Sequence, residues 1–238
     1  MRGKRTIAIA SLLLAASLAG VQAGTKTASG DRSWTAPDLA QYPVASIAML
    51  PPATFDGNVE NRKQVEQAVA QALKGSGHRW LSPILVRDYL MKAGGDSLMK
   101  AINDKILKDP RVDSLDAPRL SRTLRTRGLL SVRVDEMERR ELEADQSGRP
   151  STSIQLKAAL VDSTGRLLWT LASNETMEGA QQDAGGNIIG MKTSGLSNQA
   201  IGDIKPAPLF QEVLAKMCLR WTEVFPTHAA PDSSASGK

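Results

Sequence analysis

Two alternating apolar stretches joined by a short turn constrain the fold of this chain most strongly. Apolar and polar residues alternate over residues 154–160, and they alternate again over residues 167–171 around Trp169. The intervening residues 162–165 have the sequence DSTG, which is typical of a tight turn. Alternation with a period of two places every second side chain on the same face of a sheet. The sequence therefore predicts an antiparallel hairpin with Trp169 in its buried face.

Other segments add strands and helices around this hairpin. Residues 130–134 alternate in the same way, and the apolar run VASIAML at residues 44–50 is typical of a strand buried on both faces. Apolar residues recur at helical spacing with capping signals in the segments 62–74, 83–93, 96–109, 116–127 and 206–225. The spacing of Asn61 to Gln64 predicts Asn61 as the cap of the first of these helices, and a short strand is expected at 79–81, before the second. We therefore predict the α/β class, with a single mixed β-sheet of about four to five strands and helices packed on it.

The first 23 residues predict export from the cytoplasm. They combine a basic start, an apolar run and the small residues Val21 and Ala23 at the position that a signal peptidase recognises. The apolar run is roughly a dozen residues, whereas a membrane span needs about 20. We expect cleavage after Ala23 and a periplasmic protein without a membrane span. It carries no lipid, because no cysteine lies near the cleavage point.

The remaining chain divides by composition. Residues 24–43 are rich in small and polar residues and predict a flexible leader, which drapes on the domain through Trp34. Residues 44–225 form the α/β domain, with a charged projecting connection at 137–150 and a long glycine-rich loop at 174–205. Residues 226–238 predict a disordered tail. One domain of this length can bury a sufficient core without disulfides.

Few side chains in this chain support catalysis or metal binding. It has one cysteine and two histidines, so the familiar zinc ligand sets cannot be built, and we predict no metal and no cofactor. Cys218 lies beside the apolar stripe of the last predicted helix and is expected to be a buried structural thiol. A catalytic Cys–His pair would need His78 or His228, which fall in a turn and in the tail. We therefore predict no catalytic residues and no enzyme.

A row of arginines is the one candidate for partner binding. Arg119, Arg122 and Arg125 recur every third residue on the helix predicted at 116–127. They form either a solvated helix face or a docking surface for an anionic partner. Binding to nucleic acid is not expected, because the aromatic residues of a base-stacking surface are missing and the protein is exported.

Several phrases resemble a superfamily of bacterial envelope proteins that includes CsgG, LpoB and the amino-terminal domain of TolB. They are VASIAMLPP at 44–52, RLSRTLRTRGLLSVRV at 119–134 and DSTGRLLW at 162–169. The resemblance implies a mixed sheet with packed helices, no catalytic residues, and work done by binding other envelope proteins. The lipidated cysteine common in that group is absent here, as are hairpins that would insert into a membrane.

The function expected is therefore that of a noncatalytic periplasmic binding or assembly factor, acting on an envelope protein or machine. One alternative is a subunit of an oligomeric export apparatus. Another is a small periplasmic enzyme that uses the carboxylates of Asp135 and Glu136.

Overall fold

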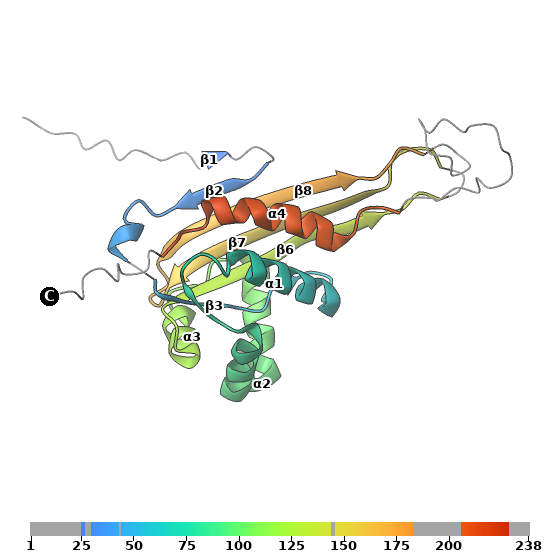
Figure 1. Cartoon of the computed structure of the whole chain (residues 1–238). Helices are drawn as coiled ribbons and strands as arrows, with labels where there is room; N and C mark the ends of the chain where they lie inside the picture. Colours follow the sequence, from blue (N-terminus) through green and yellow to red (C-terminus); the bar gives the residue numbers. More distant parts are fainter. Residues whose placement is uncertain (1–24, 27–29, 43, 144–145, 183–205, 229–238) are drawn as a thin grey trace, which may run out of the picture.

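The structure is a computed structural model that describes residues 25–26, 30–42, 44–143, 146–182 and 206–228 (Figure 1). Its strands are β1 (Thr25–Lys26), β2 (Arg32–Thr35), β3 (Ser46–Met49), β4 (Ala53–Thr54), β5 (Arg79–Leu81), β6 (Gly128–Arg140), β7 (Ser151–Asp162) and β8 (Leu167–Glu178). Its helices are the 3₁₀ turn η1 (Leu39–Gln41), α1 (Val59–Leu73), α2 (Pro83–Lys108), α3 (Asp116–Leu124) and α4 (Phe210–Val224).

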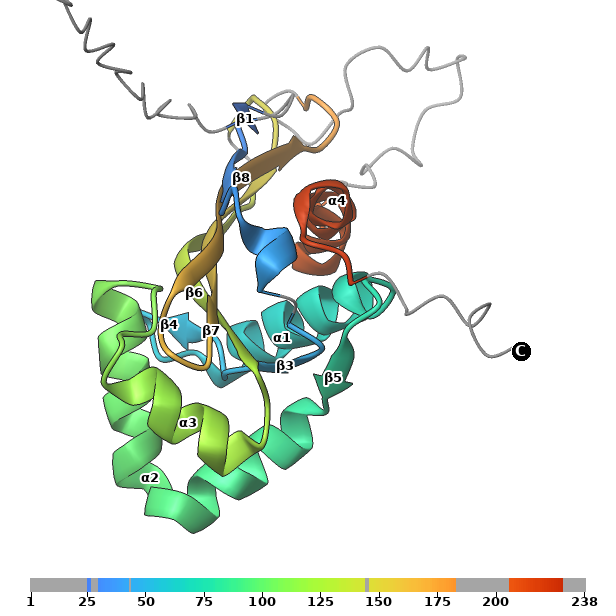
Figure 2. The same cartoon turned by 90° about the vertical axis from the view of Figure 1, so that its left-hand side faces the viewer.

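A single mixed sheet forms the middle layer of three. Seven strands follow in the order β1-β2-β8-β7-β6-β3-β5, and β4 pairs with β6 off this path. Helices α1 and α4 pack on one face, and α2 and α3 pack on the other (Figures 1 and 2). The α/β class and the mixed sheet are confirmed.

The sheet has more strands than the four to five expected. The strands that the sequence analysis missed, β1, β2 and β4, have 2, 4 and 2 residues. Such short strands show no alternation, and backbone pairing with a longer neighbour holds them. The residues of β2 lie within the leader predicted at 24–43. They are hydrogen-bonded antiparallel to β8, with Trp34 opposite Thr170, so this part of the leader is an ordered strand.

The predicted hairpin is the longest feature of the sheet. Strands β7 and β8 pair antiparallel around the turn at 163–166, and β6 pairs with β7 from Gly128 opposite Asp162 to Arg140 opposite Ser151. The strands run well beyond helices α1 and α3 (Figure 1). Residues 137–140, predicted as part of a connection, therefore belong to β6, and residues 174–178, predicted as the start of the glycine-rich loop, belong to β8. Glu138 and Arg140 are exposed, whereas Met137 packs against the main core, so one face of this part of the strand is open.

Local chemistry sets the helix ends. Helix α1 begins after Asn58, whose side chain accepts hydrogen bonds from the backbone of Glu60 and Asn61, so Asn61 is not the cap that its spacing to Gln64 predicted. Helix α2 is interrupted at Gly95, which has a φ of 61°. This break separates the two helices predicted at 83–93 and 96–109. Helix α3 ends at Leu124 and is capped by Arg125, whereas Gly128, the predicted terminator, begins β6.

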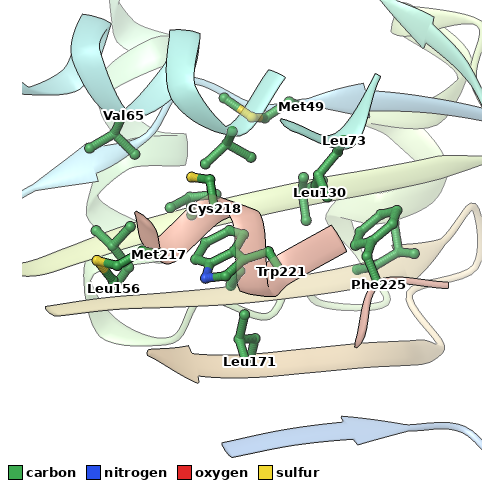
Figure 3. Close-up of a cluster of buried hydrophobic side chains, with 14 of the residues drawn as sticks. Met49, Val65, Leu73, Leu130, Leu156, Leu171, Met217, Cys218, Trp221 and Phe225 are labelled. Carbon is green, nitrogen blue, oxygen red and sulfur yellow. The ribbon is translucent and has the colours of Figure 1, made fainter. Parts of the chain in front are cut away.

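The main core lies between the sheet and helices α1 and α4. Trp169 is fully buried there, and its indole Nε1 donates a hydrogen bond to the carbonyl of Val224 at 2.9 Å. Its ring packs edge-to-face on Phe225 at 5.0 Å. Cys218 and Trp221 of α4 point into this cluster (Figure 3). The predicted burial of Trp169 and Cys218 is confirmed.

Candidate binding groove

Helices α1 and α4 lie side by side and border a groove with a volume of about 1050 Å³. Strand β5 and the start of α2 close it on a third side. The groove is lined by Met49, Gln64, Glu66, Gln67, Ala68, Ala70, Gln71, Ala72, Lys74, Trp80, Leu81, Ser82, Pro83, Gln211, Leu214, Ala215, Cys218, Leu219 and Thr222. The volume reaches the size of a typical ligand site.

Small residues open this groove. Ala68 and Ala72 lie one turn apart on α1, and Ala215 lies on α4. Because alanine ends at Cβ, the two helices leave space above the buried side chains of Leu214 and Cys218. Apolar atoms therefore form the floor and most of the walls.

Uncharged amides surround this apolar floor. Gln64, Gln67 and Gln71 follow one another along α1, and Gln211 stands at the start of α4. The Oε1 atom of Gln64 is buried without a hydrogen-bond donor among the described residues. A glutamine amide both donates and accepts hydrogen bonds. The rim thus offers paired donors and acceptors without charge.

Charge is scarce along the groove. The lining contains two ionisable groups that carry charge at neutral pH, Glu66 and Lys74, in the part of the chain that the structure describes. Glu66 is already bound by the guanidinium of Arg87 on α2, and its side chain is only 9% exposed. Among the described residues, the exposed face of the groove therefore presents one charged side chain, that of Lys74.

The thiol of Cys218 lines the groove and is unreactive at neutral pH. Burial raises the pKa of this thiol to about 12, although the nearby Arg220 opposes the shift. The thiol is protonated at neutral pH, whereas a nucleophile or a metal ligand must be a thiolate. Neither His78 nor His228 lines the groove, so no imidazole there can act as its base.

Asp135 and Glu136 do not form a carboxylate pair. Asp135 accepts hydrogen bonds from Arg133 at 2.5 Å and forms an ion pair with Lys157 at 3.0 Å, while Glu136 binds the amide of Gln155. Burial alone would raise the pKa of Asp135, but Arg133 and Lys157 outweigh it and lower the pKa. A general acid at neutral pH needs a raised pKa, so this geometry gives the enzyme hypothesis no support.

The three arginines singled out in the sequence are exposed but not equivalent. Arg119 forms an ion pair with Asp116 at 3.2 Å, and Arg122 donates to the carbonyl of Pro118 at 3.1 Å. Arg125 caps the helix in the left-handed conformation with a φ of 53°. Arg122 and Arg125 line a shallow hollow of about 360 Å³ together with Arg127, and Arg119 lies outside it. Partner binding by these residues stays a prediction.

The described residues hold neither a metal site nor a membrane-spanning helix. They contain no group of three or more histidine, cysteine or acidic side chains able to hold a metal ion. None of the helices in those ranges combines the length and apolarity that crossing a membrane requires.

The sequence analysis missed the groove although parts of it leave a signal. The apolar stripe of α1 was recognised, but the alanines and glutamines beside it were not considered together. Ala68 and Ala72 lie beside Gln64, Gln67 and Gln71 in the sequence of α1. Such a pattern of small and uncharged polar residues could have predicted a helix face that no large side chain covers. The contribution of α4 carries no such signal, because only folding brings it beside α1.

Comparison with known proteins gives partial matches. No family model matches the chain, and no curated protein matches it. Among solved structures, lipoprotein GNA1162 from Neisseria meningitidis is 21% identical over 56% of this chain and 83% of its own, with a TM-score of 0.44. The PelC dodecamer from Paraburkholderia phytofirmans gives 16% identity over 84% and 98%, with a TM-score of 0.43.

The C-terminal domain of LpoB from Salmonella enterica is also among the similar structures. It is 12% identical over 58% of this chain and 85% of its own, with a TM-score of 0.31. LpoB is one of the proteins named for the sequence resemblance, and membership of the wider superfamily stays a prediction.

Proposed function

We propose that this protein is an exported, noncatalytic binding factor of the bacterial envelope, and that the α1–α4 groove holds an apolar segment of a partner protein. The observation that carries the proposal is the groove itself, with its volume of about 1050 Å³ and a mainly apolar lining that holds few charged groups. The signal sequence predicted at residues 1–23 supports a periplasmic location.

The chemistry of the groove favours a polypeptide as its occupant. Apolar side chains bind the apolar floor around Leu214, and the glutamine amides of the rim can pair with backbone N–H and C=O groups. A cationic substrate would find no free carboxylate in this lining, because Glu66 is held by Arg87, and Lys74 is the one exposed charge there among the described residues. Interfaces with an apolar centre and a polar, uncharged rim are typical of protein partners.

An exposed leucine adds to this argument. Leu219 lines the groove from α4, and it is 67% exposed. Together with the partly buried Trp80 on the facing wall, it offers apolar surface that an incoming side chain would cover. Removal of such surface from water contributes roughly 25 cal/mol per Å² before the cost of ordering the partner.

Site-specific cross-linking in the native envelope tests the proposal. A photoreactive phenylalanine replaces Gln71 in the groove, and a matched variant carries it at Ala101, an exposed position on α2 outside the groove. We expect one or a few discrete adducts from position 71, each containing an envelope protein, and none of these from position 101.

Two results would contradict the proposal. The first is the same set of adducts from both positions, or no adduct from position 71. The second is an adduct at position 71 that contains only another copy of this chain, since the groove would then be an interface between subunits, as the alternative of an oligomeric apparatus requires.

A further inference from the structure

His78 makes an unusual pair of hydrogen bonds. Its ring is 9% exposed, its Nδ1 atom lies 2.6 Å from the carbonyl oxygen of Val44, and its Nε2 atom lies 2.9 Å from the carbonyl oxygen of Pro226. Val44 precedes β3, the second strand from one edge of the sheet, and Pro226 follows α4. The imidazole therefore links the segment before β3 to the segment after α4, and Pro226 lies 148 positions from His78 in the sequence.

Both partners of this ring are acceptors. A backbone carbonyl oxygen can only accept a hydrogen bond, and a neutral imidazole carries one N–H donor. In the neutral ring, one of the two contacts would bring a nitrogen lone pair against an oxygen lone pair. Both hydrogen bonds form together only when both ring nitrogens carry protons, which makes the ring an imidazolium ion.

The segment that His78 holds is seated by further contacts. The backbone N–H of His228 donates to the carbonyl of Ser76 at 2.9 Å, and the His228 ring stacks on that of His78 at 5.7 Å. At Gly77, which has a φ of 81°, a Cβ atom would lie only 2.1 Å from the carbonyl oxygen of His228. The chain therefore needs glycine at this position to let residues 226–228 pack so closely.

The surroundings leave His78 without an acidic partner. A cavity of about 490 Å³ beside the ring is lined by residues of η1, β7 and the segments before β3 and after α4. Its other titratable side chains, among the described residues, are Tyr42 and His228. Arg166 lies over the Tyr42 ring at 3.9 Å and is itself paired with Asp38. No carboxylate in this lining would keep the imidazolium charged as the pH rises.

We propose that His78, protonated on both ring nitrogens, is a pH-sensitive latch that fastens residues 226–228 to the sheet. Histidine changes its charge between about pH 5 and 8 more readily than other side chains. Loss of one ring proton removes one of the two hydrogen bonds, so the latch is closed on the acidic side and weakens toward the alkaline side. Opening it would uncover the cavity beside the ring and free the end of α4, one wall of the groove.

The first test determines the protonation state of the His78 ring directly. Full-length mature protein without a tag is labelled with ¹⁵N-histidine, and the two histidine rings are assigned with a His228→Gln variant, which leaves His78 alone. We expect both ring nitrogens of His78 to carry protons at pH 5.5 and only one at pH 8. A ring with one proton over the whole range would overturn the proposal.

The second test measures how firmly residues 226–228 are held. Hydrogen exchange at the amide of residue 228, corrected for the intrinsic effect of pH, should be at least about tenfold faster at pH 8 than at pH 5.5, as expected for losing a hydrogen bond to a charged group. The His78→Gln variant should exchange rapidly at both pH values, while His228→Gln should keep the pH dependence. An unchanged pH dependence in His78→Gln would overturn the proposal.

A second variant tests the latch even if His78→Gln does not fold. Gly77→Ala places a methyl group against the carbonyl of His228 and should displace the segment without touching the imidazole. Exchange at residue 228 should then be rapid at every pH, although the imidazole itself is unaltered. Protection equal to that of the unaltered protein would contradict the latch.

Discussion

Arg220 and Asp31 form a bidentate ion pair, with Nε to Oδ2 at 2.8 Å and Nη2 to Oδ1 at 3.1 Å. The pair joins α4 to the segment before β2, across 189 positions of the sequence. Arg220 also binds Glu175 of β8 through Nη1 at 2.7 Å. Both carboxylates are almost completely buried, with side chains 2% and 6% exposed. One guanidinium thus fastens a wall of the groove to the edge of the sheet.

Replacing this arginine should be costly. Arg220→Met leaves Asp31 buried without its cation, and loss of one partner from a buried pair costs about 3 to 5 kcal/mol. Lys216→Met is the matched control, because Lys216 is 56% exposed and binds only Glu175, so it should cost about 1 kcal/mol or less. Urea unfolding of both variants compares the two losses. Equal losses would show that the guanidinium does not organise this edge.

Acid should weaken the contacts of Asp135. Its lowered pKa means that its carboxylate stabilises the folded state above the ordinary pKa of 3.8, and that this contribution is lost as the pH falls below that value. Asp135→Asn should therefore be less stable at pH 7, by about 1 kcal/mol or less. The difference from the unaltered protein should shrink toward pH 3. Urea unfolding between pH 3 and 7 measures it, and two parallel stability curves would refute the assignment.

The arginine row is tested by a triple charge reversal. Arg119, Arg122 and Arg125 are exposed, so changing all three to glutamate should leave the unfolding midpoint nearly unchanged. We expect equal recovery of partners at low and moderate salt, because Arg119 and Arg122 are already bound to their own helix. If recovery falls and loses its dependence on salt, these residues are a docking surface after all.

The sequence predicted those parts of the fold that local periodicity determines. Alternation around Trp169 was sufficient to predict the hairpin and its buried face, and the apolar run at 44–50 was sufficient for β3. Strand β2 could not be found this way, because its residues form a strand through pairing with β8 rather than through their own pattern. The cap of α1 was misplaced because Asn58 and Asn61 are both suitable residues, and only the backbone conformation decides between them.

The candidate site was harder to predict than the fold. Cys218 was correctly expected to be buried, but its place under a groove depends on the packing of α4 beside α1. His78 and His228 were treated as separate residues in a turn and a tail, whereas the structure stacks their rings. Contacts between segments so distant in sequence follow from the tertiary fold, and no local pattern records them.

The most direct test of the central claim is the affinity of the partner identified by cross-linking for two matched variants. Ala215→Glu places a charge inside the groove, and Ala101→Glu places the same charge on an exposed helix face outside it. Both should unfold at the midpoint of the unaltered protein. Burying an unpaired carboxylate is unfavourable, so titration calorimetry should show binding at least about tenfold weaker for Ala215→Glu and unchanged for Ala101→Glu. Equal affinity of the two variants would contradict the groove as the binding site.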